Sequence, residues 1–120
     1  MSEMQNPKHY DLEERTLEFA KRTVRFCKGM SKNIIDDEIR RQLVRAAASV
    51  GANYIEANES LSKKDFITRI KICRKEAKET GYWFKLIETH NPSLKSEQEL
   101  LLKESIELMK IFGSILTKSQ

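Results

Sequence analysis

Residues 62–87, SKKDFITRIKICRKEAKETGYWFKLI, carry a sustained apolar pattern that decides the fold. Apolar or small residues recur there at alternating steps of four and three: Phe66, Ile70, Cys73, Ala77, Thr80, Phe84 and Ile87. Such steps keep residues on one side of an α-helix, whereas a half-buried strand alternates at every second residue. Ser62 followed by Asp65 resembles a capping box, which satisfies free N–H groups at a helix start. We therefore expect a long helix that reaches about His90 and is stopped by Asn91–Pro92.

The same periodicity predicts a helix on each side of a loop at residues 29–35. The earlier helix is capped by Asp11, ends near Lys28 and carries two apolar stripes, namely Leu12, Phe19 and Phe26, and Leu17, Ala20, Val24 and Cys27. The later helix starts at the acidic residues 36–38 and reaches about Asn58. Its buried seam is expected to hold Ile39, Leu43, Ala46, Val50, Asn53 and Ala57.

A fourth helix is predicted to open at a second capping box, Ser96 to Glu99. The chain of 120 residues has only two prolines and four glycines, which favours few long helices over many strands and turns. Short connections force helices that follow each other in sequence to run antiparallel. The fold class is therefore predicted to be all-α, an antiparallel up-down-up-down four-helix bundle over residues 11–118. Residues 1–10 are expected to form a flexible N-terminal tail.

The composition is that of an ordinary globular protein with a mild positive charge. The formal net charge is +4, from 22 basic and 18 acidic residues, which permits an anionic partner without requiring one. Cys27 and Cys73 fall on apolar helix positions and are interpreted as core residues. The first residues lack the apolar segment of a signal peptide, and no apolar run approaches the roughly 20 residues that span a bilayer. We therefore expect a cytoplasmic protein with no membrane partner.

Residues 46–55, AAASVGANYI, have almost no polar side. A helix that is apolar all round must be covered all round, and one bundle covers only one side. A second copy of the chain would supply the cover, and small residues would let its backbone approach closely. The alternative is that alanine is simply a good helix former that tolerates water. The residues predicted to lie at an oligomer interface or to set register are Ala48, Ser49, Ala52, Asn53, Ile55, Glu56, Tyr82 and Trp83.

No pattern of residues indicates catalysis, a metal or a cofactor. The two histidines, His9 and His90, belong to no Glu-x-x-His motif, and no glycine-rich phosphate loop is present. Three acidic residues of the middle helices, Glu56, Glu76 and Glu79, are interpreted as partners of arginines, with catalytic carboxylates as the alternative. The candidate arginines are Arg45, Arg69 and Arg74. We therefore predict no catalytic residues, no metal site and no cofactor, and expect a protein that is not an enzyme.

Basic residues gather on the helix predicted after residue 62: over residues 63–85, eight cations outnumber three acids, Asp65, Glu76 and Glu79. Long cationic side chains suit phosphate contacts. The predicted nucleic-acid-binding residues are Arg22, Arg25, Lys63, Lys64, Arg69, Lys71, Arg74, Lys75 and Lys78. The alternative is a solvated helix face with internal pairs such as Lys75 and Glu79. The aromatic run 82–84 could stack on bases, although adjacent aromatics more often pack in a core or an interface.

Two motifs resemble those of a known family. Ser49, Val50, Asn53 and Glu56 precede Phe66, Glu76, Ala77, Glu79, Thr80, Tyr82 and Trp83. This order resembles the four-helix-bundle proteins encoded in intervening sequences of bacterial 23S ribosomal RNA genes, over about residues 12–116. Departures from the family pattern are changes of size at packing positions: Tyr54 for isoleucine, Ala57–Asn58 for a Glu–Gly pair and Phe84 for leucine.

The family is similar to the accessory protein of diversity-generating retroelements, a pentameric ring that binds a reverse transcriptase and nucleic acid. The resemblance thus implies a homopentamer with a basic ring surface and no established catalytic residues. We expect a non-enzymatic, self-assembling bundle that binds RNA or a ribonucleoprotein, with ribosomal RNA and a reverse transcriptase complex as candidates. The alternative is a protein–protein interaction scaffold with no role in nucleic-acid binding.

Overall fold

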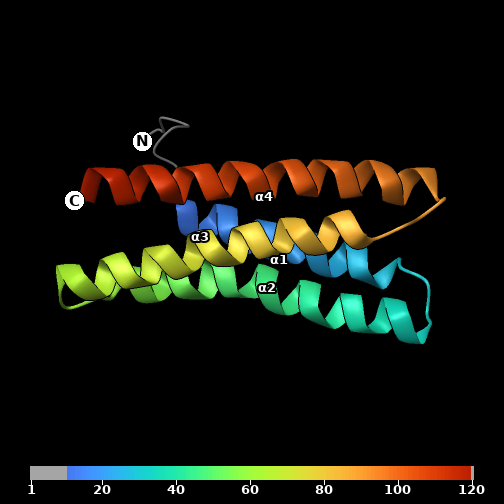
Figure 1. The fold of residues 1–120 in the computed structure, drawn as a ribbon, viewed down its shortest axis with the longest axis horizontal. Coiled ribbons are helices and arrows are strands. Elements are labelled where there is room, and N and C mark those ends of the chain that lie inside the picture. The colour runs from blue at the N-terminus through green and yellow to red at the C-terminus, as the bar shows by residue number, and fades with distance from the viewer. Residues whose placement is uncertain (1–10, 120) are drawn as a thin grey trace.

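Four helices follow one another along the chain in the computed structural model, which describes residues 11–119. They are α1 (Leu12–Lys28), α2 (Ile34–Asn58), α3 (Lys63–Leu86) and α4 (Pro92–Ser119). Successive helices run in opposite directions, and no strand occurs among the described residues (Figure 1). The predicted all-α, antiparallel four-helix bundle is confirmed. The predicted tail, residues 1–10, lies outside the described part of the chain.

Two of the helix starts form as the sequence predicts. The Asp11 carboxylate accepts a hydrogen bond from the backbone N–H of Glu13 at 2.8 Å, and Gly29 follows the last residue of α1. The Ser62 hydroxyl accepts from the N–H of Asp65 at 3.1 Å. Each cap satisfies one of the N–H groups that the first turn of a helix leaves free.

The other two helix starts differ from the prediction. Helix α2 begins at Ile34, because the side chain of Asn33 caps it by accepting from the N–H of Asp36 at 2.8 Å. Helix α4 begins at Pro92 and not at the Ser96 capping box, which lies inside the helix. The Asn91 side chain accepts from the N–H of Leu94 at 3.0 Å. Proline fits the first helical position because the N–H it lacks would have had no partner there.

Helix α3 ends at Leu86, four residues before the predicted end at His90. Ile87 already has an extended backbone, with φ −74° and ψ 130°. The Gln98 side chain of α4 donates to the carbonyls of Phe84 and Ile87 at 2.7 and 2.9 Å. These bonds satisfy carbonyl groups that the end of a helix leaves free, so contact with α4 fixes the end of α3.

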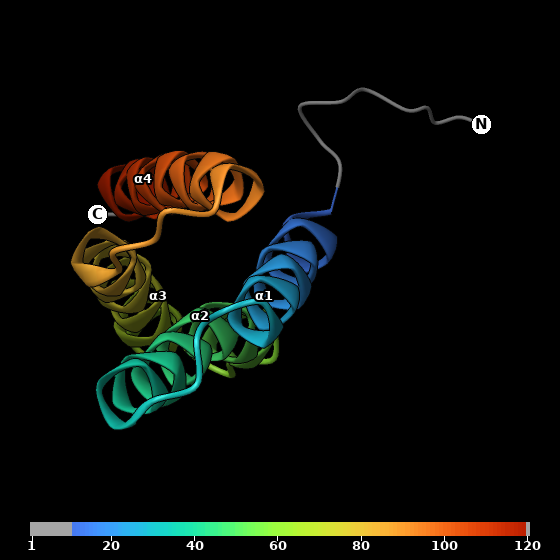
Figure 2. The ribbon, with the colours of Figure 1, turned by 90° about the vertical axis from the view of Figure 1, so that its right-hand side faces the viewer.

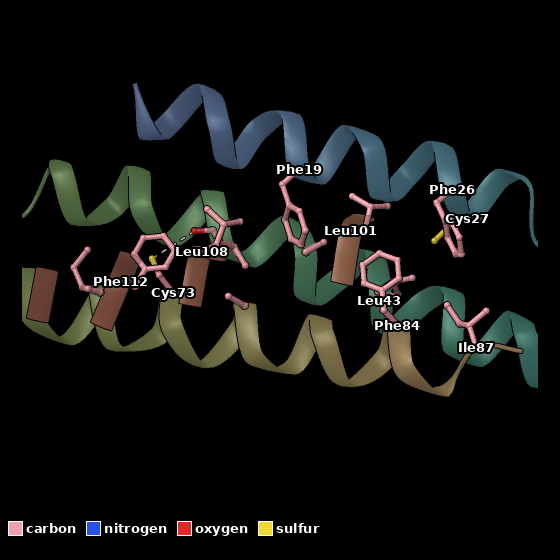
Figure 3. Close-up of a cluster of buried hydrophobic side chains, with 14 of the residues drawn as sticks. Phe19, Phe26, Cys27, Leu43, Cys73, Phe84, Ile87, Leu101, Leu108 and Phe112 are labelled. Carbon is pink, nitrogen blue, oxygen red and sulfur yellow. Dashed lines mark hydrogen bonds between the residues drawn. The ribbon is translucent and has the colours of Figure 1, made fainter. Parts of the chain in front are cut away.

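The core lies along the centre of the bundle and draws on all four helices (Figure 3). The predicted seams of α2 and α3 are confirmed for most of their residues: Leu43, Ala46, Val50, Ala57, Ile70, Cys73, Ala77, Thr80, Phe84 and Ile87 are buried. The other predicted members, Ile39, Asn53 and Phe66, are half-buried. In that core the Cys73 thiol donates to the carbonyl of Val50 at 3.5 Å. Both cysteines are free and buried, as expected.

One predicted stripe of α1 is only partly correct: Cys27 is buried and Ala20 is half-buried, but its other two members are exposed. Leu17 and Val24 are 53% and 37% exposed, while Thr16 and Thr23 are fully buried. The threonine hydroxyls donate to carbonyls one turn earlier, at 3.0 Å for Thr16 and 2.9 Å for Thr23. With its hydroxyl bonded to its own helix, each threonine presents a methyl group and packs as an apolar residue. Thr16 lies against Gly51 of α2, where an added Cβ would meet its hydroxyl oxygen at 3.0 Å.

The helices surround the core in chain order, and α1 and α4 are the neighbours with the least contact (Figure 2). Arginines of α1 bridge to glutamates of α4. Arg15 binds Glu104 through two hydrogen bonds of 2.7 and 2.9 Å, and Arg22 binds Glu97 through two of 3.0 and 3.1 Å. Within the described residues, no helix is both long enough and apolar enough to cross a membrane.

Candidate nucleic-acid interface

Seven cations share the outer side of α3, and all seven are exposed. We call this surface the α3 cationic face; it consists of Lys63, Lys64, Lys71, Arg74, Lys75, Lys78 and Lys85. At about 3.6 residues per turn, the seven fall within roughly a third of the helix circumference, and no acidic residue of α3 falls among them. With a rise of about 1.5 Å per residue, the face is about 32 Å long between Lys64 and Lys85.

None of these seven cations forms a salt bridge among the described residues, where every salt bridge within 4.0 Å uses an arginine of α1 or α2. The internal pair of Lys75 and Glu79, which belonged to the alternative interpretation of a solvated helix face, does not form a salt bridge among the described residues. Glu79 instead accepts a hydrogen bond from the indole N–H of Trp83 at 3.0 Å and pairs with Arg45 of α2. The positive charge of the face is therefore not neutralised by neighbouring carboxylates.

The environment of Glu79 keeps its carboxylate charged and bound to Trp83 and Arg45. Its pKa lies below the usual value, first because Trp83 donates a hydrogen bond to the carboxylate. The hydrogen bond and the charge of Arg45 lower the pKa further, against an opposing effect of burial, and Lys75 adds only a weaker charge effect. Glu79 thus belongs to the contact between α2 and α3.

Three predicted nucleic-acid-binding residues lie away from the α3 cationic face. Arg22 faces α4, and its bond to Glu97 raises its pKa above the ordinary value. Arg25 is exposed on α1 and pairs with Glu18 at 3.0 Å. Arg69 points toward α2 and donates to the Asn53 side chain at 3.0 Å. The structure brings together the other six and adds Lys85.

The three adjacent aromatic residues of α3 have three different environments. Phe84 is fully buried and meets Phe26 edge to face, with ring centroids 5.4 Å apart. Trp83 is half-buried and bonded to Glu79. Tyr82 is 57% exposed and contacts the Trp83 ring edge to face at 5.2 Å. Of the three, Tyr82 is the side chain that is mainly open to solvent.

The middle of α2 has an exposed apolar side. We call it the α2 apolar stripe; it consists of Val44, Ala48, Ala52 and Ile55, of which Val44 is half-buried and Ile55 is 49% exposed. Val24 of α1 lines the same shallow pocket as Val44, so the apolar surface extends onto α1. Of the predicted interface residues, Ala48, Ala52, Ile55, Glu56 and Tyr82 are exposed, and Ser49, Asn53 and Trp83 are half-buried.

Polar residues between α2 and α3 form contacts within the chain. The Asn53 amide donates to the Ser49 carbonyl at 2.9 Å and accepts from Arg69. Arg45 reaches Glu79 and lies 3.6 Å from Glu76, in agreement with the interpretation of these acids as arginine partners. Glu56 and Arg74 take part in no salt bridge among the described residues.

The described residues contain no group of three or more His, Cys, Asp or Glu side chains that could hold a metal ion. Burial raises the pKa of Cys27 to about 11 and that of Cys73 to about 12, so both thiols are protonated near neutral pH. His90 is exposed, and His9 lies outside the described part of the chain.

Comparison with known proteins gives a family and a fold. Residues 8–114 match the family described as 23S rRNA-intervening sequence protein. A crystal structure from Bacteroides thetaiotaomicron, of a protein with unknown function from the S23 ribosomal protein family, superposes with a TM-score of 0.74. The two sequences are 30% identical, and the match covers 88% of this chain and 98% of the other. No functionally curated protein matches the chain.

Proposed function

Because the chain belongs to the 23S rRNA-intervening sequence protein family, we propose that it is a self-associating, non-enzymatic bundle that binds RNA through the α3 cationic face. The RNA would be free or part of a ribonucleoprotein, with ribosomal RNA and a reverse transcriptase complex as the two candidates. The observation that carries the proposal is the α3 cationic face itself, which has seven exposed cations and no salt bridge to a described residue.

A polyanion is the partner that suits such a surface. Each phosphate neutralised by a lysine or arginine releases bound counterions, which drives binding and makes it depend on salt. The cations of the face can bind phosphates without first breaking ion pairs in the protein. A protein partner would need an equally long acidic surface, whereas every RNA backbone carries one.

Self-association is proposed from the α2 apolar stripe. In a single bundle Ala48, Ala52 and Ile55 remain in contact with water. Packing them against a second copy would remove apolar surface from water, and the small alanines would permit close approach of the two backbones. We propose a homopentamer, in which the α3 cationic face would recur on every subunit. The two free, buried cysteines suit a reducing compartment, and we propose the cytoplasm.

The test is to titrate a fluorescently labelled structured RNA at several salt concentrations. We expect the affinity to fall steeply with salt, with a logarithmic slope of about −0.7 to −0.9 for each phosphate contact. The triple variant Lys71→Gln, Lys75→Gln, Lys78→Gln should bind more weakly, with a slope shallower by about 2 to 3. A matched control removes three exposed lysines elsewhere, Lys21→Gln, Lys103→Gln and Lys110→Gln, and changes the net charge equally.

Equal losses in the two triple variants would show that overall charge acts, not the α3 cationic face. If the wild-type chain binds no RNA at low salt, the proposal of RNA binding is wrong. That result would favour the alternative function, a protein–protein interaction scaffold.

A further inference from the structure

Tyr82 interrupts the α3 cationic face with an exposed aromatic ring. We propose that this face receives single-stranded RNA in preference to duplex RNA, with an unpaired base stacked on Tyr82. The inference rests on the proposed RNA-binding function and adds to it the class of RNA and a residue that selects it.

The position of Tyr82 places its ring among the cations. Tyr82 follows Lys78 by four residues and precedes Lys85 by three, so all three share one side of α3. Lys75, two turns earlier, lies on the same side. A phosphate backbone that follows these lysines would therefore pass beside the ring.

The contacts of Trp83 hold the Tyr82 ring in place from one edge. Trp83 is anchored by its bond to Glu79, and Glu79 is in turn paired with Arg45 of α2. Tyr82 meets this fixed indole at an interplanar angle of 76°, while more than half of its own surface stays open to solvent. A ring supported in this way loses little side-chain freedom when a base stacks on it.

Base stacking separates single-stranded from duplex RNA. In a duplex the faces of the bases are covered by neighbouring base pairs, and a protein meets mainly phosphates and 2′-hydroxyls. An unpaired base can turn out and stack on an aromatic side chain, regardless of sequence. Lysines alone would bind both forms of RNA, so an exposed tyrosine among them favours the single strand.

The test uses the full-length chain and a labelled oligoribonucleotide of about 12 nucleotides with no self-complementarity. The same strand annealed to its complement is the duplex probe. We expect Tyr82→Ala to weaken single-strand binding about 5- to 20-fold and duplex binding less than about 2-fold. Tyr82→Phe should bind the single strand like the wild type. The salt slope should not change in either variant, because no phosphate contact is removed.

Unchanged single-strand affinity in Tyr82→Ala, or an equal loss for both probes, would overturn the inference. If the wild type still binds with a steep salt dependence in that case, the proposed RNA-binding function remains supported and only the role of Tyr82 is wrong. If the wild type binds neither probe at low salt, both the RNA-binding function and the role of Tyr82 are wrong. A lower assembly mass of Tyr82→Ala in light scattering, with equal loss for both probes, would instead assign Tyr82 to a subunit contact.

Discussion

Gly81 sets how closely α3 and α4 can approach. A Cβ at this position would lie 2.8 Å from the hydroxyl oxygen of Ser105, which is buried and donates to the carbonyl of Leu102 at 2.6 Å. Gly113 of α4 is a natural comparison, because the nearest atom to a Cβ there is Cδ of Arg74, at 3.9 Å. The two glycines are both helical, but only Gly81 is required by packing.

Gly81→Ala should therefore destabilise the protein, whereas Gly113→Ala should stabilise it. Alanine improves helix propensity by about 1 kcal/mol at either site. At Gly81 we expect overpacking of about 1–3 kcal/mol to exceed that gain. Ser105→Ala removes the clashing oxygen and should restore most of the stability of Gly81→Ala. Urea denaturation measures Gly81→Ala, Gly113→Ala and the double variant Gly81→Ala, Ser105→Ala. Equal stabilisation by the two single glycine substitutions would contradict the close contact.

The lowered pKa of Glu79 predicts that the protein loses stability as the pH becomes acidic. Its pKa is lowered in the folded state from the ordinary value of 4.5, so its contribution is complete above that value. The contribution is lost as the pH falls through the lower, folded pKa. Trp83→Phe removes the main cause of the shift, so the free energy of unfolding should fall less between pH 5 and pH 3 than in the wild type. Urea denaturation between pH 5 and pH 3 measures this loss of stability, with Tyr82→Phe as the control. If the free energy of unfolding depends on pH equally in Trp83→Phe and the wild type, the role of Trp83 is refuted.

Single residues also show the limit of sequence interpretation. The seams of α2 and α3 were predictable because large apolar residues recur at regular steps. The burial of Thr16 and Thr23 was not predictable, because threonine is a polar residue in the sequence. It packs as an apolar residue here only because its hydroxyl bonds to a carbonyl of its own helix. Their burial shifts the inner side of α1 and leaves Leu17 and Val24 exposed.

At the scale of the helices, the sequence predicted that four helices exist, but it did not predict all of the residues at which they begin and end. Asn91 and Pro92 have the composition of a helix stop, but α3 already ends at Leu86, and they form the start of α4 instead. The end of α3 is bound by Gln98 of α4, a contact that the local sequence does not show. The candidate interface has the same limit. Spacing places the lysines on one side of α3, but the pairing of Glu79 with Arg45 of α2, and not with Lys75 of its own helix, is a contact between helices that spacing does not show.

Helix α1 should separate from the bundle more easily than α3. It is the shortest of the four helices and has little contact with α4 beyond its arginine–glutamate pairs. A disulfide reagent can attack a buried, protonated thiol only when its helix opens. In single-cysteine variants we therefore expect Cys27 of α1 to react faster than Cys73 of α3.

Arg22→Met should increase the rate for Cys27 by up to about 5-fold, because a partly exposed pair contributes at most about 1 kcal/mol. The rate for Cys73 should stay nearly the same. If both thiols react at one rate in every variant, the bundle opens only as a whole, and the idea of a separable α1 is wrong.

At the scale of the whole molecule, the α2 apolar stripe predicts assembly. A pentamer would have a mass of about 70 kDa, five times the 14.0 kDa of one chain. Ala52→Glu and Ile55→Glu each place a charge on the stripe, where a lone bundle would tolerate it in water but a subunit interface would not. We expect both variants to keep their helix content by circular dichroism and to fall to the mass of one chain in light scattering. Ser114→Glu, at an exposed position of α4, should leave the mass unchanged.

Assembly should also strengthen RNA binding, because one RNA could then contact the α3 cationic faces of several subunits. Ile55→Glu leaves every cation of the face in place, yet we expect it to bind a long RNA at least 10-fold more weakly than the wild type. A short oligonucleotide, which reaches one subunit only, should bind both proteins alike. A wild-type chain that stays at 14.0 kDa when concentrated would contradict the assembly. Equal binding of the long RNA by an assembled wild type and a monomeric variant would show that each α3 cationic face acts independently.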